Sequence, residues 1–187
     1  MRLAGVASKD QRGAVSYTSE RLRMRPWRVG DLLDFHRIFG DGRVIWWGPE
    51  PSELASKRRL EAIVGRGAPP EPSGAGGSIP DTATYFAVEL ERTGAVVGNV
   101  TLGPAAFDSA MELGYHLAFD AWGNGYATEA AQATLQYAFG TLEQPRVVAA
   151  VAQNNARSLR VVERLGMHRV GEIERAGLRH DVFECRR

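Results

Sequence analysis

The sequence has very little of the two residue types that most often ligate metals and cross-link chains. It contains one cysteine, Cys185, and four histidines among 187 residues. A single cysteine excludes an internal disulfide, and the scattered histidines show no spacing typical of a metal site. The sequence therefore predicts a metal-free protein of a reducing, cytoplasmic compartment.

The chain also lacks an excess of charge and lacks long apolar runs. Lysine and arginine number 23 against 22 aspartates and glutamates, which gives a net charge of +1. This balance disfavours nucleic acid as a partner, because neutralising phosphates needs a concentrated basic face. Charged residues interrupt the range 1–16, which disfavours a signal peptide. No stretch approaches the roughly 18 apolar residues that span a bilayer, so we expect no membrane association.

Length and composition predict one globular domain. Hydrophobic residues make up 44% and charged residues 24%, which is typical of globular proteins. Residues 1–16 lack periodicity and are predicted to be a disordered tail, which leaves 17–187 as a single domain. The range 65–80 contains five glycines and four prolines, which predicts a surface loop, with a domain linker as the alternative.

The periodicity of apolar residues predicts a chain of mixed helices and strands. Helical spacing indicates helices over the ranges 31–39, 51–64, 127–139 and 157–165. Short apolar runs indicate strands over the ranges 22–26, 84–90, 95–102, 111–119, 146–151 and 181–185. Side chains alternate along a strand, so Glu112 and His116 are predicted to share one face.

A glycine-rich loop between the strand 111–119 and the helix 127–139 is the most informative segment. It reads Trp122-Gly123-Asn124-Gly125-Tyr126-Ala127. Glycines let the backbone approach a ligand closely, and the helix N-terminus offers unpaired N–H groups with about half a positive charge. These features favour a pyrophosphate as the ligand. The alternative is a tight turn that merely needs two glycines.

Three segments, in this order, carry a resemblance to a known family. They are Glu112-Leu113-Gly114-Tyr115-His116-Leu117, the stretch from Trp122 to Ala130, and the stretch from Asn155 to Met167. Together they resemble the GNAT acetyltransferase superfamily and, within it, the branch of ribosomal-protein N-terminal acetyltransferases (RimJ/RimL-like). Trp122 stands where the wider superfamily often has arginine or glutamine, and it looks like this branch. The resemblance implies an α/β (α+β) GNAT fold, with a mixed, mostly antiparallel, twisted sheet flanked by helices.

The resemblance also implies an N-acetyltransferase that uses acetyl-CoA as its acyl donor. The backbone of His116, Leu117 and Ala118 would pair with the pantetheine arm of the cofactor. The residues implied to hold the pyrophosphate are Trp122, Gly123, Asn124, Gly125, Tyr126, Ala127 and Thr128.

Two residues of the third segment would lie beside the same cofactor. Asn155 would help to position it, and Ser158 would lie near its sulfur, where a hydroxyl can stabilise or protonate the departing thiolate. The alternatives are an ordinary helix N-cap for Asn155 and a solvated first-turn serine for Ser158.

Acetyl transfer requires a neutral amine that attacks a thioester carbonyl, so a base has to remove a proton. Glu112 is the candidate base, acting directly or through water, and a salt-bridged carboxylate is the alternative role. His116 is the other candidate base, because an imidazole titrates near neutral pH. A non-catalytic acyl-CoA-binding module, which keeps the loop without a working base, is the rival function.

The acceptor is expected to be a primary amine. An α-amine with a pKa of about 7.7–8.0 loses its proton to a weak base more readily than a lysine with a pKa near 10.4. This favours a protein N-terminus or a small-molecule amine as the acceptor. Trp46 and Trp47 are candidates for the acceptor cleft through apolar or cation–π contact, with core packing as the alternative. The sequence leaves open whether the protein forms a homodimer.

Overall fold

The structure, a computed structural model, describes residues 7–9, 15–44, 52–66 and 84–187. Its strands are β1 (Ser8–Lys9), β2 (Val15–Thr18), β3 (Leu22–Pro26), β4 (Thr84–Leu90), β5 (Val96–Pro104), β6 (Met111–Leu117), β7 (Arg146–Ala152), β8 (His168–Arg175) and β9 (Leu178–Arg186). Its α-helices are α1 (Leu32–Phe39), α2 (Glu53–Arg66), α3 (Tyr126–Gly140) and α4 (Ala156–Arg164), and its 3-10 helices are η1 (Val29–Asp31) and η2 (Phe119–Ala121).

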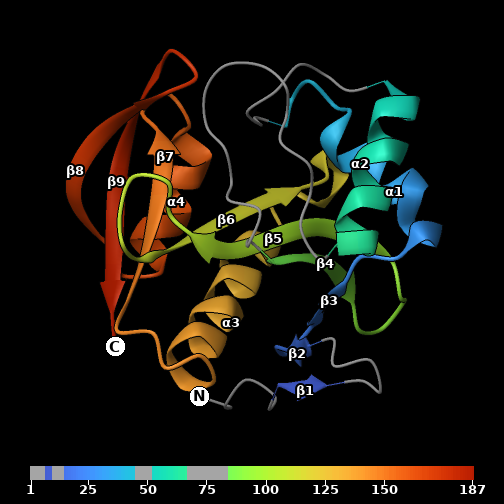
Figure 1. The fold of residues 1–187 in the computed structure, drawn as a ribbon, viewed down its shortest axis with the longest axis horizontal. Helices are drawn as coiled ribbons and strands as arrows, with labels where there is room; N and C mark the ends of the chain where they lie inside the picture. Colours follow the sequence, from blue (N-terminus) through green and yellow to red (C-terminus); the bar gives the residue numbers. More distant parts are fainter. Residues whose placement is uncertain (1–6, 10–14, 45–51, 67–83) are drawn as a thin grey trace.

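All described strands belong to one mixed sheet with the order β1-β2-β3-β4-β5-β6-β7-β9-β8. Neighbouring strands run antiparallel, except for β6 and β7, which run parallel. Helices α1 and α2 lie on one side of the central strands, and α3 lies on the other (Figure 1). The predicted fold class, a mixed and mostly antiparallel sheet flanked by helices, is confirmed.

Helix α3 packs closely on the sheet because its inner face is built from small residues. Ala130, Ala131, Ala133, Thr134 and Ala138 are all buried. Their short side chains let the helix backbone approach the strands, which fixes the N-terminal end of the helix beside the end of β6. The glycine-rich loop is therefore anchored by a rigid element on each side.

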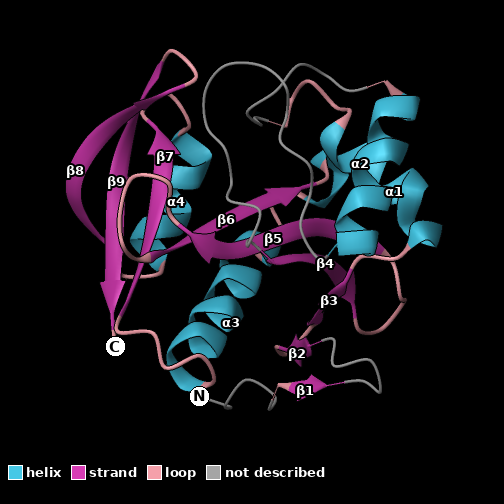
Figure 2. Ribbon diagram, in the orientation of Figure 1, coloured by secondary structure: helices cyan, strands magenta, loops and turns pink. Residues whose placement is uncertain are grey.

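Strands β6 and β7 are paired only at their beginnings. Met111 pairs with Val147 and Glu112 with Val148, and no further pair follows. Beyond this point the two strands diverge, and β7 stays paired with β9, its partner on the other edge (Figure 2). The rest of the β7-facing edge of β6 is therefore without a strand partner, and such an edge can pair with an extended ligand.

The structure corrects several of the sequence-based boundaries. The predicted strand 111–119 ends at Leu117, and the 3-10 helix η2 begins at Phe119. Strand β8 was missed, because it lies at the exposed end of the sheet and most of its side chains face solvent, which removes the apolar alternation. Within the range predicted as a tail, Ser8–Lys9 form β1 and pair with β2.

Candidate active site

The loop that follows η2 has the backbone geometry of an anion site. Gly123 and Gly125 have φ angles of 82° and 79°, in the left-handed region that favours glycine. Gly125 is the N-cap of α3, and no side chain caps this end of the helix. Asn124 donates from Nδ2 to the carbonyls of Ala121 and Trp122, at 3.1 and 3.2 Å, and so closes the loop on itself. The first N–H groups of α3 stay available to a ligand.

A clamp of Ser19, Arg21 and Glu129 fixes the first turn of α3. Glu129 Oε1 accepts hydrogen bonds from Ser19 Oγ at 2.7 Å and from the Arg21 backbone at 2.8 Å, and Oε2 accepts from Arg21 Nε at 2.7 Å. The Arg21 guanidinium also lies 4.8 Å from the centre of the Tyr126 ring. The clamp ties the start of β3 to the helix whose N-terminus faces the loop.

The loop lines a cavity of about 360 Å³ between α3 and α4. Of the residues predicted to bind cofactor, those on its wall are His116, Leu117, Trp122, Gly123, Gly125, Tyr126, Ala127, Thr128, Asn155 and Ser158. Ala118 and Asn124 do not line it. Ala118 is fully buried, and its backbone N–H donates to the Val97 carbonyl at 2.9 Å, so it is already used inside the sheet.

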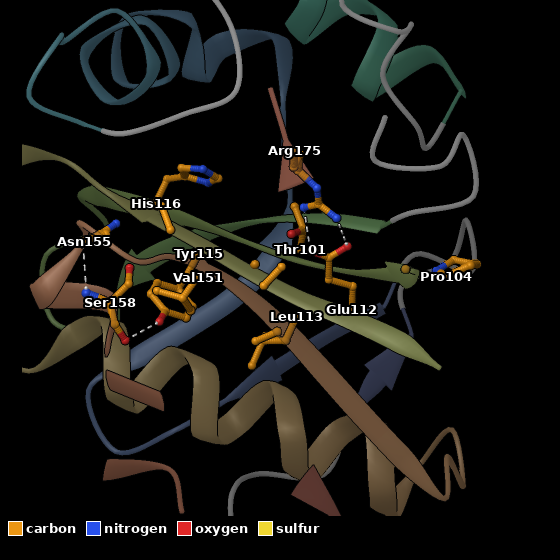
Figure 3. A pocket seen from close by; sticks show the side chains of 15 residues that line it. Thr101, Pro104, Glu112, Leu113, Tyr115, His116, Val151, Asn155, Ser158 and Arg175 are labelled. Atoms are coloured by element: carbon orange, nitrogen blue, oxygen red, sulfur yellow. Dashed lines mark hydrogen bonds and ion pairs between the residues drawn. The ribbon is translucent and has the colours of Figure 1, made fainter. Parts of the chain in front are cut away.

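A second, smaller cavity of about 70 Å³ opens where β6 and β7 diverge. Glu112 and Arg175 lie at one end of the group that lines it, and Asn155 and Ser158 lie at the other (Figure 3). Tyr115, His116, Asn155 and Ser158 line both cavities. The two cavities therefore meet across the split in the sheet. The prediction that Glu112 and His116 share a face agrees with their place on the wall of the smaller cavity.

Glu112 forms a two-pronged ion pair with Arg175 at the end of β8. Arg175 Nη1 and Nη2 donate to the two carboxylate oxygens at 2.8 and 3.0 Å, and the side chains are 6% exposed for Arg175 and 15% for Glu112. The Arg175 guanidinium also lies 5.3 Å from the centre of the Phe107 ring. The salt-bridge alternative for Glu112 is thus present. Sequence reasoning missed Arg175, because nothing local marks a residue whose partner is 63 positions away.

His116 is held as a neutral imidazole. Burial, helped by the nearby charge of Arg59, lowers the pKa of His116 to about 4. Its ring lies 5.3 Å from the centre of the Phe39 ring, and its Nδ1 has no hydrogen-bond partner among the described residues. An imidazole with so low a pKa takes up a proton poorly at neutral pH, which weakens the case for His116 as the base.

Asn155 and Ser158 stand at the start of α4, beside the split. Asn155 Oδ1 accepts the Ser158 backbone N–H at 3.1 Å, so Asn155 is the N-cap of the helix. The Ser158 carbonyl accepts the Tyr115 hydroxyl at 3.2 Å, and burial raises the pKa of Tyr115 to about 12. Tyr115 thereby fixes the helix start against β6. Asn155 has this capping role and also lines both cavities.

The remaining predictions concern two tryptophans, a loop, the cysteine, metal binding and membranes. Trp46 and Trp47 lie outside the described residues, as does most of the predicted loop 65–80. Cys185 lies on β9, and burial raises the pKa of its thiol, which disfavours a nucleophilic thiolate. In the described ranges no three His, Cys, Asp or Glu side chains gather as a metal site, and no described helix is long and apolar enough to cross a membrane.

The mixed sheet flanked by helices is the fold of a family of acetyltransferases. Residues 21–168 match the family model described as "Acetyltransferase (GNAT) domain", and the chain belongs to this family. It is 40% identical over 87 residues to YkkB of Bacillus subtilis, a match over 46% of this chain and 51% of that protein, about half its length. It is 26% identical over 154 residues to the N-acetyltransferase YnaD of the same organism, over 82% and 83% of the two chains.

Solved structures with the same fold include enzymes with different acceptors. An acetyltransferase of the GNAT family from Bacillus anthracis has a TM-score of 0.75 at 24% identity, over 91% of this chain and 98% of that one. The ribosomal-protein-S5-alanine acetyltransferase of Vibrio fischeri has a TM-score of 0.69 at 22%, over 92% and 96%. The aminoglycoside acetyltransferase AAC(6')-Ib, solved with coenzyme A, has a TM-score of 0.70 at 16%, over 89% and 95%. At these identities the likeness is one of fold.

Proposed function

We propose that the protein transfers the acetyl group of acetyl-CoA to a primary amine by direct attack. The observation that carries this proposal is the meeting of two cavities at Tyr115, His116, Asn155 and Ser158, where β6 and β7 diverge. Such a passage lets a thioester enter from one side of the sheet and an amine from the other. Proximity and orientation of this kind lower the barrier of a two-substrate reaction.

The larger cavity suits acetyl-CoA, which supplies the thioester carbonyl when bound. Its wall combines the free N–H groups at the start of α3 with the strand edge of β6, and these features fit a pyrophosphate and an extended amide arm respectively. The proposed contacts follow the predicted residues, with two exceptions. Ala118 and Asn124 shape the backbone and the loop rather than the cavity wall.

Glu112 is the proposed base on the amine side. Arg175 holds it in one orientation, and a carboxylate offers about four lone-pair sites, so an amine or a water can still donate to it. The base removes the proton from the amine nitrogen more readily after the attack, because the nitrogen becomes more acidic as its bond to the carbonyl carbon forms. A fixed carboxylate on the cavity wall is sufficient for that step.

Ser158 is the proposed hydrogen-bond donor that stabilises the departing thiolate, which takes its proton from solvent, and Asn155 is the proposed positioning group. Both lie on both cavity walls at the start of α4. We propose no covalent enzyme intermediate, because Cys185 lies on β9 and lines neither of these cavities. The transfer is then a single displacement, with the acetyl group passing directly from sulfur to nitrogen.

The proposed acceptor is a protein N-terminal α-amine or a small-molecule amine, as in the ribosomal-protein branch that the sequence resembles. An α-amine is partly neutral at pH 7, since its pKa is about 7.7–8.0. Among proteins of the same fold, one is described as acting on ribosomal protein S5 and another on aminoglycosides, and both kinds of acceptor belong in a test panel. We place the activity in the cytoplasm, where acetyl-CoA and reduced thiols occur together.

The Glu112–Arg175 ion pair favours a second candidate function. A carboxylate committed to a structural pair would leave an acyl-CoA-binding module without a base. This alternative predicts tight binding of acetyl-CoA without release of free thiol.

The test combines ligand binding with turnover. Acetyl-CoA at 100 times its dissociation constant should stabilise the protein by about 2.7 kcal/mol in a thermal-shift titration. Free thiol should then appear with at least one amine from a panel of N-terminal peptides, polyamines and aminoglycosides. Initial-rate patterns should indicate a ternary complex. Ping-pong kinetics or a trapped acetyl-enzyme would rule out direct transfer, and binding without turnover on the whole panel would favour the acyl-CoA-binding module.

A further inference from the structure

Helix α4 turns a row of arginines toward the larger cavity. Arg157, Arg160 and Arg164 all line it, and they follow one another at the i, i+3, i+7 spacing of one helix face. From the first to the last the row covers two helical turns, or about 10 Å. It therefore extends well beyond the point where α4 meets the loop.

These three arginines carry an uncompensated positive charge. Eight other arginines of the described chain form an ion pair with a carboxylate, as Arg43 on the wall of this cavity does with Asp41 at 2.5 Å. In contrast, none of the three on α4 forms an ion pair within the described part of the chain. No aspartate or glutamate is among the described residues that line this cavity. The positive charge on this cavity wall therefore favours an anionic ligand.

Trp122 holds the first arginine of the row against the loop. The Arg157 guanidinium lies 4.5 Å from the centre of the Trp122 ring, and Trp122 Nε1 donates to the Leu117 carbonyl at 2.9 Å. The indole is thus fixed by the end of β6, and it positions a cation from α4 beside Gly123 and Gly125. This arrangement is an independent sign of a prepared anion site, and it gives the loop tryptophan a role.

We propose that the row divides between the two anionic groups of coenzyme A. Arg157 serves the pyrophosphate beside the loop, and Arg160 and Arg164 bind the 3'-phosphate. A phosphomonoester carries a charge of about −1.5 to −2 at pH 7, and it sits on the ribose that is joined to the pyrophosphate, so a cation one or two helical turns beyond Arg157 is suitably placed. Arg160 and Arg164 then set a preference for coenzyme A over its 3'-dephospho form. This inference rests on the proposed use of acetyl-CoA.

The test measures dissociation constants of coenzyme A and of 3'-dephospho-coenzyme A by titration calorimetry. The variants are Arg160→Gln with Arg164→Gln, Arg157→Gln alone, and Arg58→Gln as a control on the exposed face of α2. The two ligands differ only in the 3'-phosphate, so their ratio cancels any general change in the protein. Arg160, Arg164 and Arg58 are exposed, so we expect their variants to fold, and a thermal scan of each variant checks this.

The wild type should bind coenzyme A more tightly than the dephospho form. In the double variant the dissociation constant of coenzyme A should rise about tenfold or more, which corresponds to the loss of one charge-assisted contact. The dissociation constant of the dephospho form should rise less than about twofold. Arg157→Gln should lower the affinity for both ligands by the same factor, and Arg58→Gln should leave both affinities unchanged. An equal loss for both ligands in the double variant, or an unchanged preference, would overturn the assignment of the 3'-phosphate. Absence of binding by the wild type to either ligand would instead refute the proposed function.

Discussion

Replacing Glu112 with glutamine should reduce both stability and turnover, for two separable reasons. Glutamine keeps the shape of the side chain but removes the charge that faces Arg175, whose side chain is only 6% exposed. Breaking a fully buried ion pair by removing one partner costs about 3–5 kcal/mol. Glu112 is 15% exposed at a cavity edge, so we expect about 2 kcal/mol here. For a chain of this size that corresponds to a fall in Tm of roughly 4–8 °C.

Arg175→Gln is the variant that separates the two effects. It breaks the same ion pair but keeps the carboxylate on the cavity wall. If Glu112 is the base, Glu112→Gln should lower kcat by about 10²–10⁴-fold, whereas Arg175→Gln should lower it far less at a similar cost in stability. A matched control is Glu184→Gln, which breaks ion pairs with Arg146 and Arg186 and lines neither of the two cavities.

The assay has two parts. Thermal unfolding without ligand gives the stability of each variant, and free-thiol release at saturating acetyl-CoA gives kcat at a temperature where all variants are folded. Equal kcat for the wild type and Glu112→Gln would refute the role of Glu112 as base. Equal losses of kcat in Glu112→Gln and Arg175→Gln would mean that the ion pair matters only for holding the site together.

Two further predictions concern His116 and the clamp on α3. Burial lowers the pKa of His116 to about 4, so the unfolded chain takes up this proton first and stability falls as pH drops from about 6.5 to 4. His116→Gln should flatten this fall by up to about 3 kcal/mol in denaturant titrations across that range, and an unchanged slope would contradict the shift. Glu129→Gln should raise KM for acetyl-CoA several-fold with little change in kcat, because it loosens the hold of Ser19 and Arg21 on the helix that presents the loop. An unchanged KM would show that the loop keeps its shape without the clamp.

Local pattern was enough to predict the loop and the helix that follows it, and the resemblance of three segments to a known family implied the fold class. The two glycines of the loop favour left-handed backbone angles, and Gly123 and Gly125 have them. The alanine-rich face of the helix that follows is buried, as its spacing predicts. Alternation along β6 was enough to place Glu112 and His116 on one face of the strand, opposite Leu113 and Tyr115 (Figure 3). These features depend on neighbours within a few residues, and periodicity reports such neighbours directly.

Other elements carry no local signal. Strand β8 lacks alternation because it is the exposed edge of the sheet. Helix and strand ends were also shifted by a few residues, as with the strand that stops at Leu117 before η2. Burial by other elements, rather than propensity, fixes such boundaries.

The tertiary structure alone decided which charges meet. Sequence suggested Glu112 as a base, but the sheet order β6-β7-β9-β8 brings Arg175 onto its carboxylate. Sequence suggested an anion loop, but the packing of α4 places Arg157 on Trp122 and turns the following arginines into the same cavity. The physical reason is range: backbone conformation and amphipathic pattern are set by nearby residues, whereas the partner of a buried charge is set by strand order and helix packing across the whole chain.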